Sequence, residues 1–139
     1  MLKYNNSTLA EVQNLAAKLA HELTGKKAMI GLIGNLGSGK TTFVKAFAKE
    51  LKITKISSPT FVIAHEYKIS RGRLYHFDFY RLNDSKQLGP LGFDEILDGH
   101  NLVLAEWADK FPSIKNRCDI LITFKVRPGN KRDVTIQTA

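Results

Sequence analysis

An eight-residue segment rich in glycine constrains this chain more than any other feature of its sequence. Residues 34–41 read Gly-Asn-Leu-Gly-Ser-Gly-Lys-Thr and match the pattern G-x-x-x-x-G-K-[ST]. The apolar run 28–33 precedes the segment, and an amphipathic helical pattern over 42–51 follows it. An apolar run of this length is typical of a strand buried on both faces. The G-x-x-x-x-G-K-[ST] pattern indicates a phosphate-binding loop only where it follows a strand and precedes a helix. The sequence therefore predicts a phosphate-binding loop in an α/β fold.

The spacing within this loop has a physical explanation. Its glycines let the backbone curl, so that the N–H groups of residues 36–41 point at one phosphate. The helix that follows presents its positive N-terminal end to the same anion. Lys40 reaches the β- and γ-phosphates as a point charge, and the Thr41 hydroxyl is the usual ligand for Mg²⁺. We expect a nucleotide to contact Leu36, Gly37, Ser38, Gly39, Lys40, Thr41 and Thr42.

Length and composition exclude several classes of protein. A chain of 139 residues favours a single P-loop domain over 1–139. No apolar run reaches the length of a membrane span, and the N-terminal residues lack the apolar core of a signal peptide. Cys118 is the only cysteine, so a disulfide framework is impossible. We therefore expect a cytoplasmic protein with no membrane partner.

The positive charge of the chain is concentrated in its first half. The sequence has 21 Lys and Arg against 13 Asp and Glu, a net charge of +8. Residues 1–75 contain 12 basic and 4 acidic side chains (12 − 4 = +8), whereas residues 76–139 contain 9 of each. This half should attract a polyanion such as nucleotide phosphate, RNA or an acidic protein face. The other interpretation is that this positive charge serves only to keep the protein soluble.

The remaining patterns predict a helix-flanked mixed sheet with antiparallel strands added. Thr8 and Glu11 fit a capping box before an amphipathic helix that Gly25 would end. The apolar run 102–105 is typical of a second buried strand. The other expected elements are two strands at 61–69 and 73–80 joined by a turn, a broken helical stretch at 84–98, and a hairpin of 120–126 and 134–136 around 128–130.

Two acidic residues end apolar strands, and hydrolysis of a nucleotide needs a carboxylate near the metal and a group that positions water. Glu106 ends the more apolar strand and is the better Walker B candidate, whereas Asp78 ends a more polar one. Both can also be ordinary surface acids. Thr60 lies 20 residues after Lys40 in a Ser-Pro-Thr stretch, where its hydroxyl either senses the γ-phosphate as a switch loop does or belongs to an ordinary proline turn.

One further match, Asn-Lys-Arg-Asp at 130–133, fits the N-K-x-D pattern that reads guanine in GTPases. It falls in the predicted hairpin turn, no D-x-x-G stands between it and the loop, and only six residues follow it. We therefore interpret it as fortuitous. Trp107 and His76 are expected to be packing residues, although Trp107 can also stack on a ligand or partner.

Taken in order, the motifs resemble those of one protein family. They are the loop 34–43, Ser-Pro-Thr at 58–60, His-Phe-Asp-Phe-Tyr-Arg at 76–81, Leu-Gly-Phe-Asp-Glu at 91–95 and Glu-Trp at 106–107. Over nearly the whole chain this set resembles the bacterial TsaE (YjeE) family, the ATPase subunit for threonylcarbamoyladenosine modification of tRNA. Asn35 replaces the usual Asp or Glu, Lys86-Gln87 a common Glu-Glu pair, and Ala108 a frequent Pro or Ser.

The resemblance implies a P-loop NTPase-like α/β fold and a slow ATPase with ATP and Mg²⁺ as cofactors. It implies TsaD-like and TsaB-like partners, which transfer threonylcarbamoyl to adenosine 37 of tRNA; contact with tRNA would be indirect, and DNA is not involved. The implied catalytic residues are Lys40, Thr60, Asp78 and Glu106, and the implied metal ligands are Thr41 and Glu106. Whether Asp78 or Glu106 orients the attacking water stays open.

Two other functions fit a phosphate-binding loop. A small-molecule kinase needs an acceptor site and usually a mobile lid carrying arginine; Arg71, Arg73 and Arg81 are candidates, but the chain has no insertion to form a lid. A binding module whose nucleotide is structural would bind ATP without turning it over.

Overall fold

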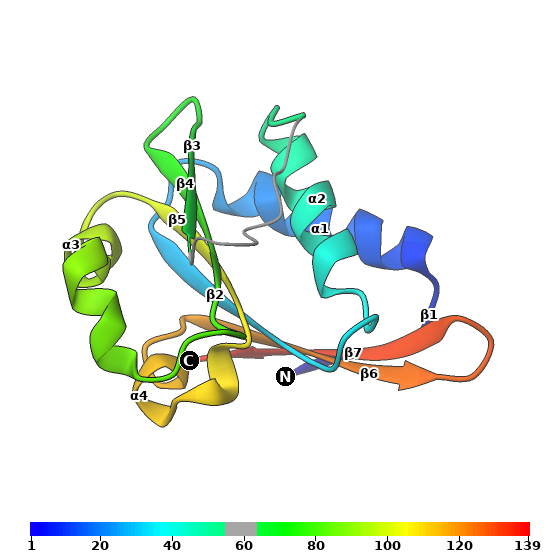
Figure 1. The fold of residues 1–139 in the computed structure, drawn as a ribbon. Helices are drawn as coiled ribbons and strands as arrows, with labels where there is room; N and C mark the ends of the chain where they lie inside the picture. Colours follow the sequence, from blue (N-terminus) through cyan, green and yellow to red (C-terminus); the bar gives the residue numbers. More distant parts are fainter. Residues whose placement is uncertain (55–63) are drawn as a thin grey trace.

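The structure, a computed structural model, describes residues 1–54 and 64–139. The described residues form a seven-stranded sheet with the order β1-β7-β6-β2-β5-β4-β3 (Figure 1). The four neighbouring strands β6, β2, β5 and β4 run parallel. The remaining strands pair antiparallel, with β7 on β6, β1 on β7 and β3 on β4. The predicted α/β class, with a mixed sheet and antiparallel additions, is confirmed.

The elements have the following bounds. The strands are β1 (Leu2–Ser7), β2 (Ala28–Ile33), β3 (Ala64–Lys68), β4 (Arg73–Asp78), β5 (Leu102–Glu106), β6 (Ile120–Arg127) and β7 (Lys131–Thr138). The α-helices are α1 (Leu9–Leu23), α2 (Lys40–Glu50), α3 (Phe93–Asp98) and α4 (Pro112–Lys115), and the 3-10 helices are η1 (Ser85–Leu91) and η2 (Ala108–Lys110). Within the described residues, no helix has the length and apolar character needed to cross a membrane.

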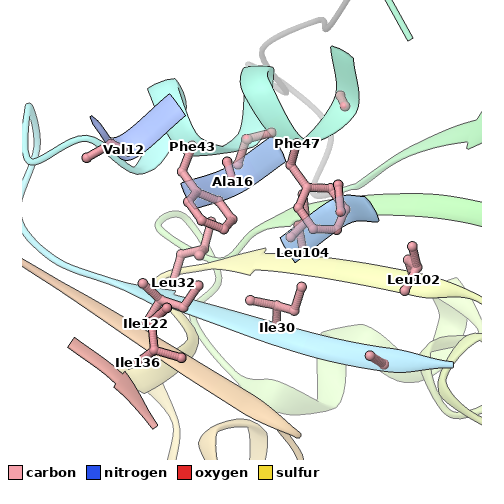
Figure 2. Packing of buried hydrophobic residues seen from close by; sticks show 14 of the residues in the cluster. Val12, Ala16, Ile30, Leu32, Phe43, Phe47, Leu102, Leu104, Ile122 and Ile136 are labelled. Atoms are coloured by element: carbon pink, nitrogen blue, oxygen red, sulfur yellow. The ribbon is translucent and has the colours of Figure 1, made fainter. Parts of the chain in front are cut away.

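Helices α1 and α2 lie side by side over one face of the sheet (Figure 1). Val12 and Ala16 from α1 and Phe43 and Phe47 from α2 are fully buried there. Figure 2 shows the rings of Phe43 and Phe47 directed at the sheet, and all four side chains belong to one cluster with Ile30, Leu32, Leu102, Leu104, Ile122 and Ile136. Because α2 is packed this tightly, its N-terminus is held in place at the end of β2.

The opposite face of the central strands is covered by η1, α3, η2 and α4. Phe77 packs edge-on against Phe93, with ring centroids 5.2 Å apart. A Cβ at Gly31 in β2 would lie 2.8 Å from both the Ala108 Cβ and the Cys118 Sγ. The close approach of this layer therefore requires glycine in the middle of the central strand.

Most expected elements are present, but several boundaries differ: β4 ends at Asp78 rather than at residue 80, and β7 spans Lys131–Thr138 rather than 134–136. The capping box of α1 is present, since Thr8 Oγ1 accepts from Glu11 N at 3.2 Å and Thr8 N donates to Glu11 Oε1 at 3.1 Å. The helix after the loop begins at Lys40, two residues earlier than expected. Strand β1, and the short helices η2 and α4, were not expected at all. Of the expected strand 61–69, residues 61–63 lie outside the described part of the chain.

The sheet topology brings the functional candidates to one edge. Parallel strands end at the same edge of a sheet, and ligands bind in the crevice outside those carboxyl ends. Asp78 and Glu106 are register partners on β4 and β5, and Glu106 is in turn opposite Leu32 on β2. Since the glycine-rich loop leaves β2 at this edge, both carboxylates lie beside it.

Candidate functional site

The loop between β2 and α2 is shaped by glycines that no other residue could replace without strain. Gly34 has φ 155°, and a Cβ there would lie 2.7 Å from the backbone oxygen of Phe124. Gly39 has φ 116° and is the N-cap of α2, with its oxygen accepting from Phe43 N at 2.9 Å. The helix therefore starts within the loop motif, and its free N-terminal N–H groups lie at the loop.

Lys40, the first residue of α2, is 4% exposed. Its ammonium donates to the Gly34 oxygen and lies 3.8 Å from the centroid of the Trp107 ring. Burial lowers the pKa of Lys40, while the negative charges of Glu106, Asp78 and Asp109 act in the opposite direction. A cation removed from water in this way interacts strongly with an anion that enters the site.

The two predicted carboxylates lie on adjacent strands at the edge of the sheet. The backbone N–H of Phe79, which follows Asp78, donates to the backbone carbonyl oxygen of Glu106 at 3.1 Å and ties the two strand ends together. Glu106 is buried, and its Oε2 lies 2.6 Å from Nε2 of His76. Oδ1 of Asp78 accepts from the backbone N–H of Tyr80 at 3.0 Å. One carboxylate is therefore fixed by a side chain and the other by the backbone.

A cavity of about 430 Å³ opens beside these groups. Its volume lies in the range of small-molecule and cofactor sites. Lys40, Asp78 and Glu106 all line it, as do the predicted contact residues Leu36, Gly37, Gly39, Thr41 and Thr42. Ser38, the remaining predicted contact residue of the loop, is buried and does not line the cavity, and its hydroxyl has no partner among the described residues. Thr60 lies outside the described residues, so its predicted role stays a prediction.

The cavity is also lined by eight residues that sequence reasoning did not assign to it: Leu9, Val44, Lys45, His76, Tyr80, Trp107, Asn130 and Arg132. His76 had one available signal, because it stands two residues before Asp78 on the same face of a strand. Trp107 directly follows Glu106 and has a left-handed backbone, with φ 60°. The expectation that His76 is a plain packing residue was incomplete, and for Trp107 packing was only one of two interpretations; each contacts a predicted site residue.

The N-K-x-D match spans the β6–β7 turn and the start of β7, and its residues have different surroundings. Asn130 and Arg132 line the cavity, but Asp133 points elsewhere. Its carboxylate accepts from Arg127 Nε at 2.7 Å and from the Asn6 N–H at 2.8 Å. The aspartate that would read guanine is therefore engaged in holding the hairpin, which agrees with the interpretation of this match as fortuitous.

The site suits a metal ion that is held only partly by protein. Among the described residues, no group of three or more His, Cys, Asp and Glu could hold an ion by itself. Mg²⁺ is usually bound by one or two carboxylates together with waters and substrate phosphates. The Thr41 hydroxyl and the Glu106 carboxylate line the same cavity as the loop, so the residues present fit such an ion in company with a nucleotide.

Comparison with known proteins gives a consistent result. A family model described as "Threonylcarbamoyl adenosine biosynthesis protein TsaE" matches residues 6–134. The tRNA threonylcarbamoyladenosine biosynthesis protein TsaE of Aquifex aeolicus is 36% identical over 129 residues, which are 91% of this chain and 88% of that protein. The protein of the same name from Bacillus subtilis is 38% identical over 120 residues, 86% of this chain and 75% of the relative. The crystal structure of YdiB from Bacillus subtilis superposes with a TM-score of 0.75 at 33% identity, covering 99% of this chain and 84% of YdiB.

Proposed function

This chain belongs to the TsaE family of tRNA threonylcarbamoyladenosine biosynthesis, and on that premise we propose that it is a slow Mg²⁺-dependent ATPase that serves this modification. One observation carries the proposal. Lys40, Thr41, Asp78 and Glu106 line a single cavity together with the glycine-rich loop. A cavity with this combination binds phosphate through backbone N–H groups and a lysine, and it has carboxylates available for a metal and a water.

Each residue has a distinct part in the proposed reaction. The N–H groups of residues 36–41 and the ammonium of Lys40 bind the phosphates. The Thr41 hydroxyl and Glu106 hold Mg²⁺, directly or through water. When bound, Mg²⁺ neutralises charge that develops on the phosphate oxygens. Burial of Lys40 strengthens its attraction to this charge, because the cation is poorly solvated in the free protein.

Either Glu106 or Asp78 orients the attacking water in this proposal. The contact with His76 fixes the direction of the Glu106 carboxylate, whereas Asp78 has one oxygen engaged by the backbone. A carboxylate with fixed geometry stabilises a defined water position without reorganisation during the reaction. Thr60, on the basis of the family resemblance, is proposed to sense the γ-phosphate.

The biological role we propose is that of an accessory subunit. ATP hydrolysis would reset a TsaD-like and TsaB-like transferase pair between rounds of threonylcarbamoyl transfer to tRNA, with tRNA contacted through those partners. The basic charge of residues 1–75 supports an association with an acidic surface on such a partner. The proposed place of action is the cytoplasm, where tRNA is modified.

The experiment that tests the activity is phosphate release from ATP labelled in its γ-phosphate. Free phosphate should accumulate slowly with Mg²⁺ present, and should accumulate faster or sustain repeated tRNA modification when the transferase pair is added. Transfer of label to a small acceptor instead of water would show a kinase. Tight ATP binding with undetectable turnover, even with the pair present, would show a nucleotide of structural function. Either result overturns the ATPase proposal.

A further inference from the structure

Arg132 is a buried arginine whose hydrogen-bond acceptors are all neutral. It is 2% exposed and stands near the start of β7, beyond the hairpin turn. Its Nε donates to the Ser38 oxygen at 3.3 Å, and Nη1 donates to the oxygens of Ser7 at 3.4 Å and Asn130 at 3.1 Å. Nη2 donates to Oδ1 of Asn130 at 3.4 Å. None of the ion pairs found among the described residues includes Arg132.

These contacts join three separate parts of the chain at the phosphate-binding loop. Ser38 lies in the loop, Ser7 ends β1 just before α1, and Asn130 lies in the β6–β7 turn. The first two acceptors are 94 and 125 residues from Arg132 in the sequence. A planar guanidinium can donate in several fixed directions at once, which an ammonium cannot do with the same geometry. Arg132 is therefore the link that holds the loop against the far end of the sheet.

The contact with Ser38 also fixes the orientation of the next amide. In a planar trans peptide, the C=O of one residue and the N–H of the next point in opposite directions. Since the Ser38 oxygen faces Arg132, the N–H of Gly39 faces away from it. The amides of a phosphate-binding loop must all point to its concave side, where the anion lies. An outward Ser38 carbonyl held by Arg132 gives the Gly39 amide that direction.

We propose that Arg132 is a positioning residue for nucleotide binding: it holds the Ser38–Gly39 peptide in the orientation that binds phosphate. The proposal rests on the nucleotide-binding function proposed above and adds a residue outside the loop motif. It also explains how a buried guanidinium with neutral acceptors is tolerated. Arg132 lines the cavity, so an anionic nucleotide compensates its charge when the site is filled.

The test compares Arg132→Lys and Arg132→Gln with wild type. Lys125→Gln serves as the matched control, because Lys125 lies on the same hairpin, is exposed and carries the same charge. ADP affinity is measured by calorimetry, and KM and kcat for ATP are measured at steady state. Both Arg132 variants should weaken ADP binding by about ten-fold or more and raise KM, the effect of losing a charge-assisted hydrogen bond. Their kcat at saturating ATP should stay within about two-fold of wild type, and the control should not differ from wild type.

Several results would overturn this assignment. Unchanged ADP affinity in a folded Arg132→Lys or Arg132→Gln protein would remove the positioning role, and so would a loss of kcat with unchanged KM. If both variants misfold, hydrogen exchange at Nε of Arg132 in the wild-type protein decides the matter: ADP should slow it, because the loop that accepts the bond becomes fixed, and an unchanged rate contradicts the proposal. Wild-type protein that binds no ADP would instead refute the proposed function itself.

Discussion

Nε2 of His76 and Oε2 of Glu106 lie 2.6 Å apart, and both side chains are buried at the carboxyl ends of β4 and β5. Parallel pairing of the two strands brings the imidazole within reach of the carboxylate. The same carboxylate lines the cavity with Lys40, so the histidine fixes a group that faces the glycine-rich loop. The direction of Glu106 is thus set before any ligand arrives.

Replacing this carboxylate should separate turnover from binding. Glu106→Gln keeps the size of the side chain but removes its charge, so the proposed metal ligand is lost together with one of the two carboxylates proposed to orient water. We expect turnover to fall by at least about a hundredfold, the usual contribution of a positioned acid or base, while ADP binding stays measurable by calorimetry. Glu50→Gln, an exposed change at the end of α2, is the control. Wild-type hydrolysis by the Glu106 variant would remove this residue from the proposed reaction.

Lys40→Ala should have the opposite effect and weaken binding itself. Removing the buried ammonium takes away a charge-assisted contact with the phosphates, which should cost about 1–3 kcal/mol of ADP affinity. Calorimetry of ADP binding at fixed ionic strength measures the change. Lys49→Ala, which removes the same charge from an exposed position on α2, should have little effect. Equal affinities for the Lys40 variant and wild type would contradict the role of the loop.

The parts of this fold that local patterns specify could be predicted from the sequence. The strand, loop and helix around residues 28–50 follow from hydrophobic periodicity and glycine spacing, and Asp78 and Glu106 were identified because each ends an apolar strand. Strand β1 could not be found in this way. Its sequence, Leu-Lys-Tyr-Asn-Asn-Ser, has little strand propensity, and it is extended because it pairs with β7 at the other end of the chain.

Arg132 and His76 show why a site is harder to predict than the strands that support it. Arg132 donates hydrogen bonds to the backbone oxygens of residues 7 and 38, and no local sequence pattern predicts contacts between residues so far apart in the chain. His76 reaches Glu106 only because β4 pairs in parallel with β5. The loop motif is read within eight consecutive residues, whereas these contacts exist only after the sheet has formed.

Cys118 offers a probe of folding that is independent of nucleotide. Burial, with a smaller effect from Asp119, raises the pKa of this thiol to about 12. Sγ lies 3.6 Å from the Ile114 oxygen, and it is the only thiol in the chain. Since the thiolate is the reactive form, alkylation by iodoacetamide at about pH 8 should be roughly a thousandfold slower in the native protein than in urea. Mass spectrometry of quenched samples measures both rates. Comparable rates would show that Cys118 is accessible in the native state.

The last prediction concerns acid sensitivity at the hairpin. Hydrogen bonds from Arg127, and then from the backbone N–H of Asn6, hold the pKa of Asp133 below its ordinary value of 3.8. Because the folded-state pKa is the lower one, the stabilisation is complete above the unfolded-state pKa and is lost as the pH falls through the folded-state value. The loss should therefore begin near about pH 5 and continue below pH 3.8.

Asp133→Asn should accordingly destabilise the protein at neutral pH and make its stability less dependent on acid. The asparagine retains an oxygen for the Asn6 N–H, but its interaction with Arg127 no longer includes a charge. Urea unfolding of wild type and variant at pH 7 and pH 3 measures the effect, with Asp98→Asn as a control at an exposed carboxylate on α3. The difference in midpoint between wild type and Asp133→Asn should be larger at pH 7 than at pH 3, whereas Asp98→Asn should stay close to wild type at both. An equal difference at both values would show that the Arg127–Asp133 pair contributes nothing through its charge.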